Sequence, residues 1–198
     1  MLKTSVVAIC IAVSSAAFAQ LPSFGKSSGG GGVTAEQLVK DYAQADIAVL
    51  TAQSRLLTAL GKKDQAAKLD AQAAALNSGA TKDGLSDSTK LQGQSLKEME
   101  EGWKTQNGKL DAEGKGKYAE GLGFLGRGVQ KYASLKSSIS GYKPSITSIG
   151  PSASAASYVV STAPQQTTNL TNTLQKAIEF AKSNDIPIPA DATAAVKF

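Results

Sequence analysis

The stretch YAEGLGFLGRGVQKYASLKSSI, residues 118–139, carries the clearest helical pattern in this sequence. Its large apolar side chains recur at steps of three, four or seven residues: Tyr118, Leu122, Leu125, Val129, Tyr132 and Ile139. An α-helix turns once in about 3.6 residues, so this spacing places them on one helix face. The pattern predicts an amphipathic helix that Asp111 caps at its start and Pro144 ends.

Glycines share this helix with the apolar face. Gly114, Gly121 and Gly128 are seven residues apart and therefore fall on nearly the same side. Each glycine costs roughly 1 kcal/mol relative to alanine inside a helix, so a compensating contact is expected. We predict a face for close helix packing, with a groove for a partner or ligand as the alternative. The G-x-G-x-x-G of Gly121, Gly123 and Gly126 lacks the preceding strand that dinucleotide binding requires.

The first helix of the domain has a defined start and end. Thr34 followed by Gln37 matches a capping box, and Gly61 is the expected C-cap. Between them, apolar residues recur with helical spacing at Leu38, Tyr42, Ala45, Val49, Ala52, Leu56 and Ala59. The short break after this helix predicts that the next one folds back as an antiparallel hairpin.

Two helices are expected between that hairpin turn and Asp111. The first ends at Gly79 and faces the core with Ala66, Leu69, Ala73 and Leu76. The second begins at Asp83 or Asp87, which can cap it, and ends near Gly108. Its apolar face comprises Leu96, Met99, Trp103 and Leu110, with Gln92 and Gln106 as polar interruptions.

The sequence changes character after Pro144 and becomes rich in serine, threonine and alanine. We expect a short helix over 151–160, a break at Ala163-Pro164, and a last helix over 165–183. Pro187 and Pro189 predict an extended C-terminal tail. The fold class predicted is therefore all-α, an antiparallel bundle of five to six helices.

The N-terminus has the three parts of a signal peptide. Lys3 gives a basic start, residues 6–17 form an uncharged apolar run, and Ala17-Phe18-Ala19 offers small residues before cleavage. We predict a signal peptide over 1–19, a flexible Gly/Ser-rich linker over 20–32 and a helical domain over 33–198. The product is then periplasmic or secreted. No later stretch reaches the ~20 apolar residues that a transmembrane helix needs.

Composition excludes several kinds of chemistry. The sequence has no histidine, and its one cysteine, Cys10, would leave with the signal peptide. The usual zinc, copper and haem ligands are therefore missing, as is the commonest general base. We predict no cofactor, no metal and no enzymatic activity. A carboxylate hydrolase that uses Glu98 or Glu101 is the minor alternative, because such enzymes need no histidine.

One half of the sequence has an uneven charge distribution. No acidic residue occurs from Gly121 to Ile178. The candidate contacts for an anionic partner in this span are Arg127, Lys131, Lys136 and Lys143. The function predicted first is a non-catalytic cell-envelope protein that binds an unknown protein partner, such as an assembly factor, chaperone-like binder or matrix component. The alternative is association with anionic lipid or glycan through this basic span. The net charge of +5 is too small to indicate nucleic-acid binding.

Overall fold

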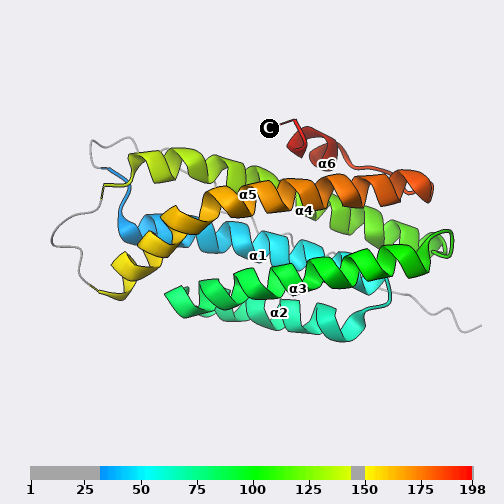
Figure 1. Cartoon of the computed structure of the whole chain (residues 1–198), viewed down its shortest axis with the longest axis horizontal. Helices are drawn as coiled ribbons and strands as arrows, with labels where there is room; N and C mark the ends of the chain where they lie inside the picture. Colours follow the sequence, from blue (N-terminus) through cyan, green and yellow to red (C-terminus); the bar gives the residue numbers. More distant parts are fainter. Residues whose placement is uncertain (1–31, 144–149, 198) are drawn as a thin grey trace, which may run out of the picture. The chain divides into compact units, whose positions relative to one another are not determined.

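A computed structural model of the chain describes residues 32–143 and 150–197, which form six α-helices and no strand (Figure 1). In chain order the helices are α1 (Ala35–Ala59), α2 (Lys63–Ser78), α3 (Lys82–Gln106), α4 (Ala112–Gly141), α5 (Pro151–Ser183) and α6 (Ala190–Ala195). All six belong to one compact unit that begins at Gly32. The predicted signal peptide and almost all of the predicted linker lie outside the described residues.

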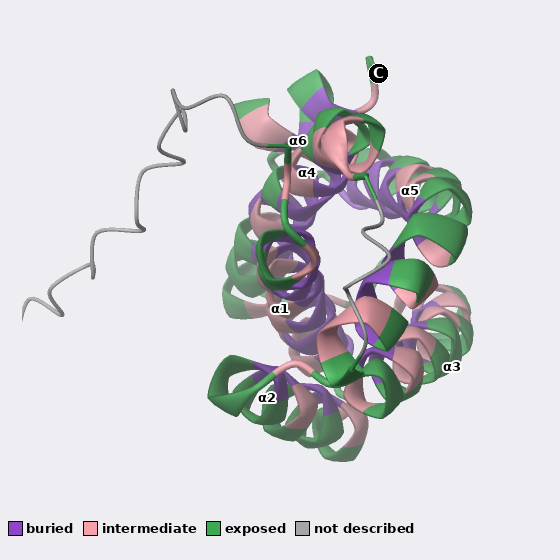
Figure 2. Cartoon of the chain, turned by 90° about the vertical axis from the view of Figure 1, so that its left-hand side faces the viewer, coloured by how far each residue is buried: buried purple, intermediate pink, exposed green. Residues whose placement is uncertain are grey.

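Helices α1 to α5 run in alternating directions, which confirms the predicted all-α antiparallel bundle (Figure 1). Helix α1 lies at the centre and packs against each of α2, α3, α4 and α5. Its predicted apolar face is fully buried at Leu38, Tyr42, Ala45, Val49, Ala52 and Leu56. Buried faces of the other helices turn toward the same interior, and exposed faces turn outward (Figure 2).

Two predicted N-caps and two predicted helix ends are confirmed. The Thr34 hydroxyl accepts a hydrogen bond from the Gln37 N–H at 3.1 Å, and the Asp111 carboxylate accepts one from the Gly114 N–H at 2.7 Å. Each cap satisfies one of the unpaired amides in the first turn of its helix. Gly61 (φ +79°) follows α1, and a second left-handed glycine (φ +72°) follows α3 near its predicted end.

The predicted cap of α3 was wrong. Thr81, and neither Asp83 nor Asp87, caps this helix, because the Thr81 hydroxyl accepts a hydrogen bond from the Gly84 N–H at 3.1 Å. Asp83 lies in the first turn instead, where a carboxylate still interacts favourably with the helix dipole. The whole helix therefore starts earlier than its sequence pattern suggested.

The predicted break at Ala163-Pro164 is also wrong, because α5 continues through Pro164. A proline inside a helix removes one backbone hydrogen bond and costs about 3 kcal/mol. Both halves of α5 bury side chains in the core, at Ala156 and Val159 before the proline and at Leu174 after it. This burial outweighs the local penalty, and the helix bends between its yellow and orange halves in Figure 1.

The chain after α5 is extended only in part. Pro189 has extended backbone angles, yet it also begins α6, whose Ala192 and Ala195 are fully buried. Helix α6 packs mainly on α4. The predicted extended tail therefore ends at Pro189, and the following residues cover part of the bundle.

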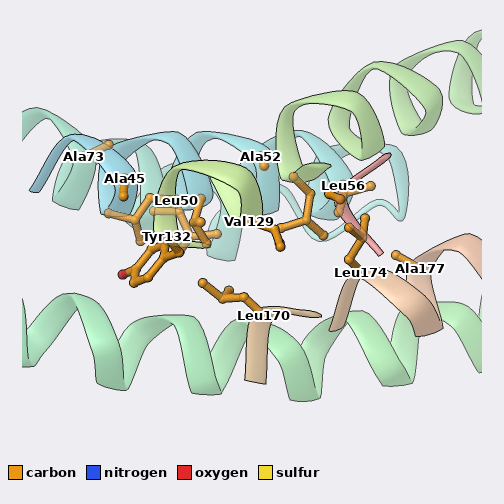
Figure 3. Packing of buried hydrophobic residues seen from close by; sticks show 14 of the residues in the cluster. Ala45, Leu50, Ala52, Leu56, Ala73, Val129, Tyr132, Leu170, Leu174 and Ala177 are labelled. Carbon is orange, nitrogen blue, oxygen red and sulfur yellow. The ribbon is translucent and has the colours of Figure 1, made fainter. Parts of the chain in front are cut away.

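The core joins side chains from helices far apart in the sequence. Leu50 and Leu56 of α1 lie near Val129 of α4, with Leu170 and Leu174 of α5 on the same interior (Figure 3). Within residues 32–143 and 150–197, no helix is both long enough and apolar enough to cross a bilayer. Burial of the apolar side chains of this core stabilises the bundle.

Candidate functional site

The predicted glycine face of α4 divides into two environments. A Cβ at Gly121 would lie 3.0 Å from the Leu56 backbone nitrogen, and a Cβ at Gly128 would lie 2.8 Å from Val49 Cγ2. Real Cβ atoms essentially never approach as closely as at Gly128, and the distance at Gly121 is tighter than nine in ten real Cβ contacts. Both glycines thus bring the α4 backbone against α1. Gly114 lies instead beside Asp111, the cap of its own helix.

A third close approach involves Gly126, which faces α6. A Cβ on Gly126 would lie 2.5 Å from the Asp191 carbonyl oxygen and 2.6 Å from the Ala192 nitrogen. Only glycine fits here, because backbone atoms cannot rotate away as a side chain can. The sequence pattern did not predict this contact, because the prolines at 187 and 189 favoured an extended tail where α6 forms.

The Arg127 side chain makes an ion pair and a ring contact within the chain itself. Its guanidinium pairs with the Asp191 carboxylate at 2.5 Å and lies 4.3 Å from the centre of the Phe124 ring. Arg55 covers the same ring at 4.2 Å and pairs with Glu120. Cation–π contacts and ion pairs together hold α1, α4 and α6 in register. Arg127 therefore contributes little free positive charge to an external partner.

The three remaining basic candidates, two on α4 and one just after it, differ in exposure. Lys131 is half-buried, and burial lowers the pKa of its ammonium group. Lys136 and Lys143 are exposed. Lys136 lies within α4, whereas Lys143 follows the extended C-cap residue Tyr142 and lies outside the helix. Of the four basic candidates, Arg127 is paired within the chain, Lys131 is half-buried, and Lys136 and Lys143 are exposed to solvent.

Lys136 borders a groove between α4 and α5, here called the α4–α5 groove. The groove has a volume of about 540 Å³ and walls that are mostly apolar. Helix α4 contributes Tyr132, Ala133, Lys136, Ile139 and Ser140, and α5 contributes Ala163, Pro164, Thr167 and Thr168. Pro164, whose ring bends α5, is itself part of the wall. Its polar groups include the Lys136 ammonium, the exposed hydroxyls of Ser140 and Thr168, and the half-buried hydroxyl of Thr167.

The inner wall of the groove connects to a buried polar network. The Tyr132 hydroxyl donates to Asp46 Oδ1 at 2.5 Å, and the Gln92 side-chain amide donates to the same oxygen. Asp46 is fully buried, and its second oxygen has no hydrogen-bond partner within the described residues. Tyr42 packs edge-to-face on Tyr132, with ring centres 5.3 Å apart. Helices α1, α3 and α4 meet at this network.

Burial dominates the electrostatics of the network. It raises the pKa of Asp46 to about 6, although hydrogen bonds from Ser88, Tyr132 and Gln92 act in the opposite direction. Burial also raises the pKa of Tyr42 and Tyr132 above the usual range for tyrosine. The sequence pattern identifies Gln92 as a polar interruption of an apolar face, but the burial of Asp46 was not predicted. The available signal was the spacing of Asp46, four residues after Tyr42 and three before Val49.

The carboxylates of the hydrolase alternative form a surface ion pair. Glu98 and Glu101 both contact the Lys62 ammonium, at 2.9 Å and 2.5 Å. This ammonium lowers the pKa of Glu101, whereas a catalytic acid needs a raised pKa. In the part of the chain that the structure describes, no group of three or more histidine, cysteine, aspartate or glutamate side chains is placed to hold a metal ion.

Comparisons with protein families, with curated proteins and with solved structures found no match to this chain. Function is therefore inferred from the geometry of these residues. Among the candidates on α4, the one that borders a groove is Lys136.

Proposed function

We propose that this chain is an exported, non-catalytic binding protein whose α4–α5 groove holds an amphiphile with an anionic head group. The observation that carries the proposal is the position of Lys136 at the edge of a mostly apolar groove of about 540 Å³. Apolar walls bury a hydrocarbon chain, and the ammonium group attracts a carboxylate or phosphate. This volume falls within the ~300–1,000 Å³ of small-molecule sites.

Charge complementarity supports an anion over a cation. No acidic residue occurs in the sequence between Gly121 and Ile178, so neither helix segment that lines the groove carries a carboxylate. Lys136 is therefore the charged side chain among the residues that line the groove. Long-range attraction of this kind weakens with added salt.

Size favours an amphiphile over a protein partner at this place. A stable protein interface buries ~800 Å² on each side and is centred on well-packed apolar or aromatic anchors. Val160 is the exposed large apolar residue found among the described residues, so the outer surface offers few such anchors. A groove lined by Ala133, Ile139 and Pro164 suits a narrow hydrocarbon chain better.

Calorimetric titration of the mature protein with laurate tests the proposal. We expect a Kd on the order of 10 µM, weakened about five- to tenfold by Lys136→Gln, since that change removes one charge–charge contact. Lys104→Gln, an exposed lysine on α3 outside the groove, serves as the matched control and should leave the affinity unchanged. Dodecyltrimethylammonium, with an equal chain and opposite charge, should bind weakly.

Two results would contradict the proposal. Equal affinity for the anionic and the cationic amphiphile would remove the role of Lys136. Binding to anionic vesicles without any binding of monomeric laurate would favour a membrane surface over the groove. The proposal of export depends on the predicted signal peptide, residues 1–19. Mass spectrometry of the intact exported protein should give the mass of a chain that starts at Gln20.

A further inference from the structure

A second hollow lies on the other side of α5, between α5 and α3, and is here called the α3–α5 cleft. Its volume is about 390 Å³, and it shares no lining residue with the α4–α5 groove. Gln53 of α1 and Gln92 of α3 line it, together with Gln166, Asn169 and Asn172 of α5. Neutral carboxamides therefore dominate its polar surface, in contrast to the apolar walls of the groove.

Two of these amides lack a partner for their oxygen. Gln53 is 1% exposed and Gln92 is 4% exposed, and neither side-chain oxygen accepts a hydrogen bond from any described residue. The nitrogen of Gln92 is held by Asp46 and by the Ser88 hydroxyl, so its orientation is determined. Both vacant groups are acceptors. Buried acceptors without a donor are unfavourable, and a bound molecule that brings donors would satisfy them.

A glycine keeps the cleft open. Gly93 lies inside α3, where glycine is disfavoured, and a Cβ at this position would meet nothing within 4 Å. Helix packing therefore does not explain this glycine, in contrast to Gly121 and Gly128, which contact α1. Because Gly93 lines the cleft, any longer side chain would reduce the space available there.

The charge of the cleft points to a neutral occupant. Its one charged lining residue, Lys176, pairs with Glu100 at 2.7 Å. Leu96 and Leu170 supply small apolar areas beside the amides. A sugar ring has the matching surface, with hydroxyl donors at its edge and a C–H face that packs on apolar side chains. A cationic donor would lose its hydration without gaining a carboxylate.

We propose that the α3–α5 cleft binds a neutral saccharide, whose hydroxyl groups donate to the side-chain oxygens of Gln53 and Gln92. Exposed Asn169 and Asn172 lie at its edge and provide further donors and acceptors. This site is independent of the amphiphile groove, and either one can fail without the other.

Saturation-transfer NMR on the full-length mature protein with glucose, N-acetylglucosamine, maltose and cellobiose tests the proposal. We expect at least one of these sugars to bind with a Kd on the order of 1 mM. Gly93→Leu should weaken that binding at least about tenfold by occupying the cleft. Gly116→Leu is the matched control, because Gly116 is also an exposed helical glycine with nothing within 4 Å and lies outside the cleft. It should leave sugar binding unchanged.

Gln53→Met separates hydrogen bonding from shape, since it keeps the side-chain length and removes the acceptor. We expect it to weaken sugar binding about fivefold or more while the thermal midpoint stays equal or rises, because an unpartnered buried acceptor is lost. The proposal is overturned if none of the four sugars binds. It is also overturned if Gly93→Leu binds as well as the control, or if an uncharged acetylated dipeptide amide binds and the sugars do not.

Discussion

Replacing the buried carboxylate, Asp46→Asn, should stabilise the protein at neutral pH. Asp46 is fully buried, and Tyr132 and Gln92 both donate to the oxygen Oδ1. An asparagine of equal shape keeps that acceptor and carries no charge. Its amide group takes the place of the carboxylate oxygen that has no partner within the described residues.

The magnitude follows from the pKa of Asp46. Burial raises it from the ordinary 3.8 to about 6, and one pKa unit corresponds to ~1.4 kcal/mol. The folded chain therefore binds the proton more tightly than the unfolded chain does between these two values. The free energy of unfolding should fall by about 3 kcal/mol as the pH rises from about 4 to about 6, and the loss should persist at higher pH.

Urea unfolding of the wild type and of Asp46→Asn, measured between pH 4 and pH 8, tests this prediction. At pH 7.5 we expect the variant to be more stable by about 1–3 kcal/mol, with the lower bound allowing for weaker hydrogen bonds to an uncharged acceptor. The difference should vanish near pH 4. Asp70→Asn, at an exposed position of α2, is the control for a general charge effect and should change stability by less than ~0.5 kcal/mol.

One result would refute the reasoning. If Asp46→Asn were less stable than the wild type at pH 7.5 and kept the same pH dependence, the buried carboxylate would be a net stabilising group. Its hydrogen bonds would then outweigh its desolvation.

Two further substitutions test the packing. Gly126→Ala should destabilise the fold by about 1–3 kcal/mol and release α6, because the added methyl would meet the Asp191 backbone at 2.5 Å. Gly116→Ala, with open space around it, should instead stabilise the fold by roughly 1 kcal/mol. Relative to the wild type, the urea midpoints of these two variants should shift in opposite directions. Asn184→Ala should cost about 1–3 kcal/mol in thermal unfolding, because its side chain accepts from the Gly108 N–H at 2.6 Å and is 4% exposed. An unchanged midpoint for Asn184→Ala would mean that this link between the α3–α4 turn and α5 has no role in stability.

Local signals in the sequence were sufficient for most helices. The caps at Thr34 and Asp111 and the left-handed glycines at Gly61 and Gly108 act within a few residues of themselves, so they are visible without a structure. The helical spacing of apolar residues likewise predicted the buried face of α1. The error at Pro164 has the opposite origin, because burial against distant helices outweighed a local penalty.

The two candidate binding places depend on helix contacts that spacing alone does not encode. Lys136 was a candidate because of charge, but its position beside Pro164 and Ala163 follows from how α5 crosses α4. Gln53 and Gln92 are 39 residues apart in the sequence numbering and meet only because α3 packs on α1. No local pattern connects them.

The sequence by itself determined the helical segments of α1 to α4 and most of their apolar faces, since both depend on interactions over one or two turns. Tertiary structure alone decided that α5 continues through its proline, that α6 covers Gly126, and that Asp46 is buried with a raised pKa. These outcomes depend on the desolvation and close packing of groups brought together from distant helices, and such energies arise only when the bundle has formed.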